Sequence, residues 1–379
     1  MDLSKAATEI LSGFTISMLM IPEAFSFSKI VGLEPQAGMN STMIMSFITS
    51  LLTGQPGMIS GATGSVATSL MGVTKNFGKE YIAIVALMGG VIQLLIGGTG
   101  MTKYFDKIPQ PVLSGFLVGL AILIFQGQIQ YFKDKDGQWI AGKKLAWTIG
   151  LIGLGAVVAR VSEKFQNRIP GALIGVAAVA LVANLMKAPV MQIGDAGDVK
   201  SALPKFEVPK VEWNRETFMK LLPWAIGMAI VGLIESQIML KEAGKIIGRP
   251  GDPLKETLAQ GVANIATGFG KGMGGCVLVG QSKLNYAHGA STRLSSMATS
   301  LSFGALVIFL SKFINKVPMP ALMAIMMEIV VRTGDWGSLM GGMNKNTLVT
   351  FLTVLTAVFG QNLALGVGAG TLTNYLINM

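Results

Sequence analysis

Charge is scarce in this sequence. Asp, Glu, Lys and Arg together make up 13% of the 379 residues, whereas 51% of the residues are hydrophobic. A soluble domain normally carries about 25% charged residues. The chain therefore has too little charge to cover a globule of its size with a water-facing surface. This composition excludes an ordinary soluble protein and indicates a polytopic membrane protein, in which the lipid bilayer surrounds most of the chain.

Cysteine and histidine are almost absent, with one residue of each, Cys276 and His288. A single cysteine excludes an intramolecular disulfide. Neither a metal cluster nor a triad of Cys and His is supported, so we expect no catalytic residue, no metal site and no enzyme activity. The stretch from Gly137 to Lys143 superficially resembles a phosphate-binding loop. However, Lys144 stands where the metal-binding Ser or Thr belongs, and no predicted strand precedes it.

Long apolar segments dominate what is present. They are unbroken rather than alternating, which favours membrane-spanning helices over a barrel. No cleavable signal peptide is evident. A polar stretch with several prolines divides the segments into seven before it and seven after it. They lie near 8–30, 37–53, 57–71, 81–100, 111–130, 145–159, 170–186, 221–240, 255–269, 272–286, 295–311, 318–333, 347–360 and 363–378. We predict an all-α membrane protein with fourteen transmembrane segments.

Landmarks of the first half return in the second half at nearly one offset. The motif KIPQP from Lys107 returns as KVPMP from Lys316, 209 residues later (316 − 107). The motif GMISGATG from Gly57 is echoed by GMGGC from Gly272, 215 residues later (272 − 57). A period this long suggests two fused halves, an arrangement typical of membrane transporters.

The two predicted halves comprise residues 1–186 and 221–379, joined by a linker over 187–220. An odd number of spans per half places the halves in opposite membrane orientation, so we predict an inverted repeat of seven plus seven segments. The net charge is +10, but Lys and Arg are scattered over short connectors. That placement fits the positive-inside rule and argues against nucleic-acid binding. It predicts cytoplasmic N- and C-termini in a plasma or inner membrane.

Segments 57–71 and 272–286 are too short for full spans, which need about 20 residues, and both are rich in glycine. Short, glycine-interrupted segments at matching positions of two halves indicate a transporter's binding site. A helix that begins in mid-membrane exposes unpaired N–H groups and the positive end of its dipole. Two such ends facing each other would bind an anion without a charged side chain. Alternatively, the glycines only permit close helix packing.

Carboxylates inside apolar segments are costly and usually functional. Glu23 in IPEA and Glu235 in LIES lie at equivalent positions of the two halves. Each could take up a proton or hold a cation beside a bound anion, or could serve structure by hydrogen-bonding helix ends. For Glu328 we expect a packing or interfacial role. Lys283 either draws an anion toward the site or extends to the inner face.

These motifs resemble the SulP anion permease family, whose animal relatives include sulfate, chloride and bicarbonate exchangers and prestin. The likeness covers nearly the whole chain. Its motifs are LMIPEAFSF (19–27), QPGMISGATGSVA (55–67), IPQPVLSGFLVGLAI (108–122), GLIES (232–236), AQGVANIATGF (259–269) and GKGMGGCVLVGQSKLN (270–285). The resemblance implies fourteen helices in a fold shared with uracil permeases. It also implies a core domain that moves against a gate domain, usually in a homodimer.

The resemblance also implies which residues form the site. The substrate would contact an aromatic residue of the first helix and the N-termini of the third and tenth helices. The implied substrate-binding residues are Phe27, Ser60, Ala62, Thr63, Gly64, Ser65, Gly275, Cys276, Gly280, Gln281 and Ser282. Glu235 matches the acid of the eighth helix that is tied to ion coupling, and Glu23 is its counterpart in the first half.

Three features depart from the family pattern. No C-terminal STAS domain is expected in this chain. Met239 stands four residues after Glu235, where a Thr is common, which weakens the case for a sodium site. Gln281 occupies the position of a basic residue in animal relatives, and Lys283 would lie on a different helix face.

The sequence thus predicts a secondary active transporter of a small inorganic anion, with sulfate or bicarbonate ahead of other anions. We expect alternating access, no cofactor, and coupling to protons or sodium, with protons through Glu235 slightly favoured. The alternatives are a nucleobase or organic-anion permease of the same fold, and a channel-like or sensory membrane protein that binds anions.

Overall fold

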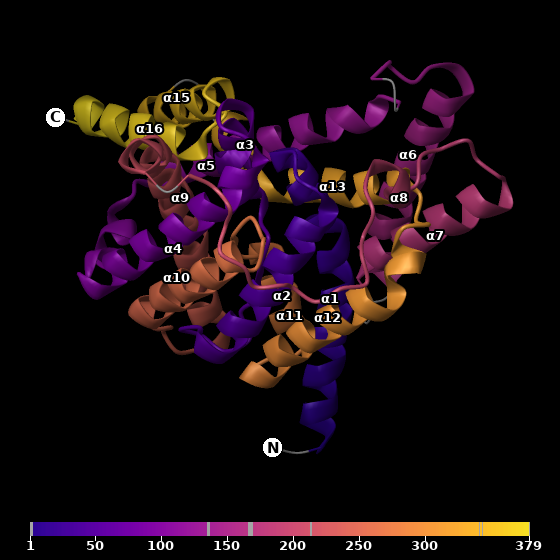
Figure 1. The fold of residues 1–379 in the computed structure, drawn as a ribbon, viewed down its shortest axis with the longest axis horizontal. Helices are drawn as coiled ribbons and strands as arrows, with labels where there is room; N and C mark the ends of the chain where they lie inside the picture. Colours follow the sequence, from indigo (N-terminus) through magenta and orange to yellow (C-terminus); the bar gives the residue numbers. More distant parts are fainter. Residues whose placement is uncertain are drawn as a thin grey trace.

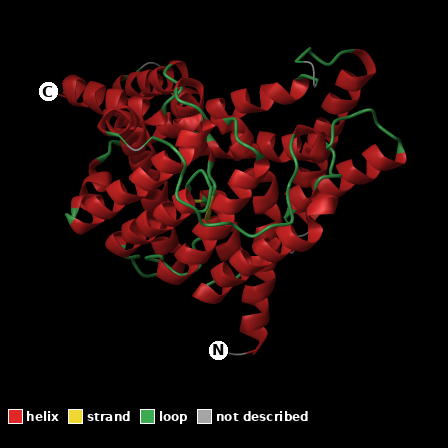
Figure 2. Ribbon diagram, in the orientation of Figure 1, coloured by secondary structure: helices red, strands yellow, loops and turns green. Residues whose placement is uncertain are grey.

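The structure is a computed structural model that describes residues 3–134, 137–165, 170–212, 214–340, 342 and 344–378. This part of the chain is overwhelmingly helical (Figure 2). The long helices are α1 (Leu3–Val31), α2 (Pro35–Leu52), α3 (Gly64–Asn76), α4 (Ile82–Gly98), α5 (Gln110–Gln128), α6 (Gly142–Phe165), α7 (Gly171–Leu185), α9 (Arg215–Ile247), α10 (Pro253–Phe269), α11 (Val279–Ala287), α12 (Arg293–Ile314), α13 (Met319–Thr333), α15 (Lys345–Phe359) and α16 (Leu363–Asn378). The short elements are α8 (Ile193–Ala196), α14 (Gly337–Met340), the 3-10 turns η1 (Lys79–Tyr81), η2 (Met101–Lys107) and η3 (Ile129–Phe132), and the strands β1 (Ser60–Gly61) and β2 (Cys276–Val277).

Every predicted apolar segment overlaps one of these helices. Within the described residues, six helical stretches are long and apolar enough to cross a membrane: Leu3–Val31, Lys79–Gly98, Gln110–Phe132, Gly142–Phe165, Arg215–Ile247 and Arg293–Ile314. The predicted helical membrane fold is therefore confirmed. The count of fourteen spans and the inverted relation of residues 1–186 to 221–379 stay predictions.

Two predicted segments begin as extended chain rather than helix. Segment 57–71 becomes helical only at Gly64, and segment 272–286 only at Val279. Glycines explain the delay, because Gly57 and Gly274 have φ values of 84° and 77°, which disfavour other residues. The predicted linker 187–220 also ends early. Asn214 caps α9 by accepting a hydrogen bond from the N–H of Thr217, so that helix begins at Arg215.

The helices pack into two groups, each drawing on both halves of the sequence. We call α1–α4 with α9–α12 the site group, in which α4 packs on α10 and α1 on α12. The flanking group consists of α5–α7 and α13–α16, in which α6 packs on α7 and α15 on α5 and α16. Figure 1 shows α6–α8 at one side of the molecule and α4 with α10 at the other. Fewer contacts cross between the groups, mainly from α1, α3 and α9.

Glu328 has an ion-pairing role within the flanking group, consistent with the expected packing or interfacial function. Its carboxylate lies 3.3 Å from Nε of Arg160 on α6 and 2.7 Å from Nε of Arg332 on α13. Arg332 also lies 2.6 Å from Glu163. These pairs join α6 to α13 and place Glu328 outside the group that carries the half-helices.

The connector between α8 and α9 crosses the face of the molecule in Figure 1. The N–H of Glu207 donates to the carbonyl of Phe269 at 2.9 Å, and the Glu207 carboxylate lies 2.9 Å from Nζ of Lys271. The hydrogen bond and positive charge of Lys271 lower the pKa of Glu207. Both side chains are well exposed, so this ion pair contributes little stability.

Candidate functional site

Two short antiparallel strands bring the half-helices together. Ser60 pairs with Val277 and Gly61 with Cys276, so α3 and α11 both start within a few residues of one two-stranded ribbon. The backbones are in close contact, since a Cβ atom on Gly275 would lie 2.0 Å from the carbonyl oxygen of Gly61. The structure thus places the two predicted half-helix tips side by side.

The extended backbone ahead of each half-helix obtains hydrogen bonds from side chains of neighbouring helices. Non-helical backbone at membrane depth is tolerated only where the protein supplies such partners. The pairs are Met273 N–H to Ser41 Oγ at 2.7 Å, Ala62 N–H to Thr42 Oγ1 at 3.1 Å, Ile59 N–H to Ser282 Oγ at 2.9 Å, and Asn285 Nδ2 to the Gly57 carbonyl at 2.9 Å. These bonds fix the position of both tips.

A polar stripe on α10 forms hydrogen bonds with the extended segments that contain β1 and β2. Glu256, Gln260 and Asn264 are spaced by four, which places them on one face of the helix. Gln260 donates to Ser60 Oγ at 3.0 Å. Asn264 donates to the Gly275 carbonyl at 3.1 Å and accepts from the Gly275 N–H at 2.9 Å. We did not predict this stripe from the sequence. Polar residues spaced by four within an apolar segment could have indicated one polar face of a helix.

Glu235 bridges the two tips. Ser65, in the first turn of α3, donates its hydroxyl to the Glu235 carboxylate. Cys276 on β2 places its Sγ 3.1 Å from the same carboxylate oxygen and 3.0 Å from Oγ1 of Thr63. Thr63 in turn caps α3 by accepting from the N–H of Val66. The predicted acid therefore contacts both half-helix tips.

Glu23 and Phe27 lie one turn apart on α1 and face different half-helices. The Glu23 carboxylate accepts a hydrogen bond from the Gln281 amide, in the first turn of α11. Its other oxygen, Oε2, is buried without a hydrogen-bond partner among the described residues. The Phe27 ring would lie 3.1 Å from a Cβ atom on Gly64, the first residue of α3. The structure thus gathers Glu23, Phe27, Gly64 and Gln281 at the tips.

The N-terminus of α11 is open. Among the residues that the structure describes, no side chain caps this helix and none lies within 4 Å of a Cβ atom built on Gly280. Gly280 is exposed, whereas Thr63, Ser65 and Cys276 are at most 1% exposed. In the described part of the chain no hydrogen bond engages the backbone N–H of Gly280 or Gln281. These N–H groups and the helix dipole favour a negative charge at this position.

Several expected substrate-binding residues hold the tips in place in this structure. Ser60, Ala62, Gly275 and Ser282 are buried, and their hydroxyl or backbone groups bond to the neighbouring helices or strands described above. Lys283 is exposed. Gln281 rather than Lys283 therefore reaches the carboxylate on α1.

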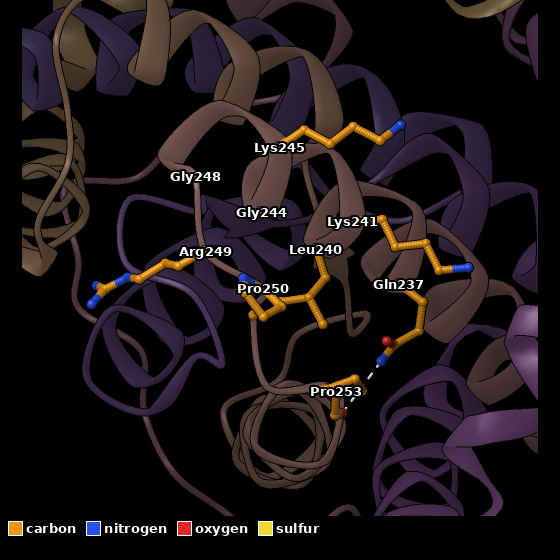
Figure 3. Close-up of a pocket in the computed structure, with 10 residues that line it drawn as sticks. Gln237, Leu240, Lys241, Gly244, Lys245, Gly248, Arg249, Pro250 and Pro253 are labelled. Atoms are coloured by element: carbon orange, nitrogen blue, oxygen red, sulfur yellow. Dashed lines mark hydrogen bonds between the residues drawn. The ribbon is translucent and has the colours of Figure 1, made fainter.

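Among the described residues, the contacts around the two tips involve two carboxylates and no Lys or Arg side chain. Within the described residues, no hydrogen bond or ion pair connects a Lys or Arg to Glu23 or Glu235. A charged carboxylate in such surroundings is costly unless a proton, a cation or strong donors compensate it. A cavity of about 460 Å³ lies elsewhere, at the end of α9 (Figure 3).

A helical membrane fold with two half-helix tips side by side is typical of secondary transporters. The sulfate permease family matches residues 7–356, and the chain belongs to that family. Family members are transporters rather than enzymes, which confirms the expectation that this protein is not an enzyme.

The chain is 34% identical over 367 residues to YbaR of Bacillus subtilis, covering 96% of this chain and 75% of that protein. It is 23% identical over 387 residues to the bicarbonate transporter BicA of Picosynechococcus, covering 95% of this chain and 68% of that protein. Its structure is similar to the transmembrane domain of a cyanobacterium bicarbonate transporter BicA, with TM-score 0.83 and 20% identity over 96% and 98% of the two chains. That similarity supports the helical membrane fold described above.

Proposed function

We propose that this protein is a secondary active transporter of a small inorganic anion, with bicarbonate or sulfate as substrate. The anion binds at the open N-terminus of α11, beside the tip of α3. The single observation that carries the proposal is that Glu235 contacts both tips through Ser65 and Cys276. Family membership and the names of relatives such as BicA support an anion as the cargo.

Ion coupling follows from the charge of this site. A negative ion beside Glu23 and Glu235 is repelled unless the carboxylates are neutralised. Proton uptake at Glu235 removes one of these charges and leaves the Ser65 hydroxyl and Cys276 thiol free to turn toward the anion. Sodium would neutralise the same charge, but Met239 offers no oxygen ligand near the acid. Protons are therefore the favoured coupling ion.

Alternating access in this proposal is a displacement of the site group against the flanking group. The two groups share few contacts, and both half-helices belong to the site group. The exposed apolar side chains of the bundle meet lipid. The protein works as a homodimer in the plasma or inner membrane, with both termini in the cytoplasm.

Uptake of radiolabelled sulfate and bicarbonate into proteoliposomes tests the proposal. We expect uptake of one of these anions to be driven by an inward proton gradient, without an effect of uracil or dicarboxylates. Competition by uracil or dicarboxylates would instead identify a permease for organic substrates. Uptake that ignores both proton and sodium gradients would contradict the coupling, and anion binding without uptake would identify a sensory protein.

A further inference from the structure

A second polar feature lies at the end of α9, outside the half-helix site. The cavity of about 460 Å³ is bounded by the last turns of α9, from Gln237 onward, and by the turn from Gly248 that leads to Pro253 (Figure 3). Gln237 closes one side by donating to the carbonyl of Pro253 at 3.4 Å. The cavity therefore lies between the end of α9 and the beginning of α10.

Glycines keep this space open. Gly248 has φ 78°, ends α9 in the left-handed conformation, and donates its N–H to Gly244. No described part of the chain lies within 4 Å of a Cβ atom on Gly248. The returning turn packs tightly on the floor, because a Cβ atom on Gly251 would lie 2.4 Å from Cδ1 of Leu240. The hollow is thus built by the local sequence and does not depend on one mobile side chain.

The rim of the cavity is cationic. Lys241, Lys245 and Arg249 follow one another at intervals of four, and no Asp or Glu is among the residues that line the cavity. Lys245 also pairs with Glu242 at 2.8 Å, outside the lining. Cations at a helix C-terminus are favoured by the dipole alone. That effect does not explain why three of them border one cavity.

The cations frame the cavity from opposite sides. Figure 3 shows Lys241 and Lys245 extending to one side and Arg249 to the other, with Leu240 and Pro250 between them. A free phosphate ion is best held by donors that converge on one point. A divided cationic rim over an apolar floor is better matched to an amphiphile that carries a phosphate.

We propose that this pocket binds the phosphate-containing headgroup of an anionic phospholipid. Basic pockets between transmembrane helices are known headgroup sites, and α9 is long and apolar enough to span the bilayer and end at headgroup level. Leu240 and Pro250 pack against the glycerol and the upper acyl chain, while the cations on the two sides contact different oxygens of the headgroup. This binding site is independent of the anion that is transported.

Lipid retention by the purified full-length protein tests the proposal. Wild type is exchanged into detergent containing equal phosphatidylglycerol and phosphatidylcholine, and bound lipid is measured by native mass spectrometry. We expect selective retention of phosphatidylglycerol. In the triple variant Lys241→Gln, Lys245→Gln and Arg249→Gln, its affinity should fall about a hundredfold at low salt, since each surface cation adds roughly a fivefold factor.

Two further variants distinguish binding at this pocket from a general effect of positive charge on lipid binding. The triple variant Lys200→Gln, Lys205→Gln and Lys210→Gln removes the same charge from the connector and should bind lipid as wild type does. The variant Lys241→Arg, Lys245→Arg and Arg249→Lys keeps the charge and should retain binding, which ties the loss in the glutamine variant to the removed charge.

Equal loss in the connector variant, or unchanged retention in the pocket variant, would overturn the site. Inorganic phosphate is the second probe. If millimolar phosphate displaces the lipid and binds with the same dependence on the three cations, the ligand is a soluble phosphate and the lipid assignment is wrong.

Discussion

Carboxylates inside the helical bundle fall into two kinds, distinguished by their hydrogen-bond donors. Glu9 accepts from the backbone N–H groups of Ser291, Thr292 and Ser295 at the start of α12. Glu256 accepts from the N–H of Gly54 at 3.0 Å. These backbone donors tie Glu9 to the start of α12 and Glu256 to the turn after α2, so both carboxylates join separate elements of the bundle.

Glu23 and Glu235 belong to the other kind, because only side chains donate to them. Glu235 has a hydroxyl and a thiol, and Glu23 has one amide and an unpartnered oxygen. Side-chain donors can rotate away when a proton arrives, whereas backbone donors cannot. Glu23 and Glu235, which only side chains contact, are therefore the carboxylates that we propose bind and release protons.

Glu235→Gln should abolish the dependence of anion uptake on the proton gradient, because the glutamine amide cannot take up or release a proton. Residual exchange down the anion gradient should persist. The measurement is proteoliposome uptake with and without an imposed gradient. Glu328→Gln is the matched control, since it removes another carboxylate from an apolar helix of the flanking group. A gradient-driven Glu235→Gln variant would contradict the assignment.

Glu23→Gln should bind the anion more tightly at alkaline pH, by roughly tenfold. The substitution keeps an acceptor for Gln281, removes one negative charge, and places a donor where the unpartnered oxygen lay. The apparent KM for the anion should also vary less with pH than in wild type. Both effects are read from uptake measured across pH 6 to about 9. A weaker and equally pH-dependent variant would argue that Glu23 serves structure.

At the scale of single elements, two glycines near the half-helices have different structural roles. Gly275 lies where β1 and β2 touch, and Gly280 lies in open space at the start of α11. Both were expected to bind substrate. Their surroundings now indicate that Gly275 is needed for strand pairing, whereas Gly280 leaves room beside the helix N-terminus.

Gly275→Ala should destabilise the protein by several kcal/mol and abolish uptake, since its Cβ atom would overlap the Gly61 carbonyl. Gly280→Ala should unfold at the wild-type temperature but bind the anion more weakly. Thermal unfolding in detergent and anion uptake report the two effects separately. If both variants fold and transport alike, the close contact of the strands is not needed for function.

At the scale of the whole molecule, the two helix groups meet at a few close contacts. A Cβ atom on Gly127 of α5 would lie 2.4 Å from Cγ1 of Ile30 on α1. This contact joins the flanking group to the site group near the half-helix tips. Movement of one group against the other must open it.

Cysteines at positions 30 and 127, introduced as Ile30→Cys and Gly127→Cys in a Cys276→Ser background, should form a disulfide that stops uptake. Reduction should restore transport, because the bond only prevents relative movement of the groups. Each single-cysteine variant is the control, and gel mobility after cleavage between the positions measures cross-linking. Full transport in the oxidised protein would contradict movement at this contact.

Composition and spacing alone predicted the membrane class, the helical segments and the pair of short segments at equivalent positions. These properties depend on neighbouring residues, because an apolar run forms a spanning helix wherever its partners lie. The acids Glu23 and Glu235 were found in the same way, since charge is rare in such runs.

Only the tertiary structure decided how these parts meet. Three contacts join elements that lie apart in the chain, up to about two hundred residues for the strands. They are the pairing of β1 with β2, the hydrogen bonds between Asn264 and Gly275, and the hydrogen bond from Ser65 to Glu235. No local pattern encodes such a pairing, because it arises from the packing of whole helices. The sequence by itself determined which residues are costly to bury in a membrane, and the fold decided which partners make that burial tolerable.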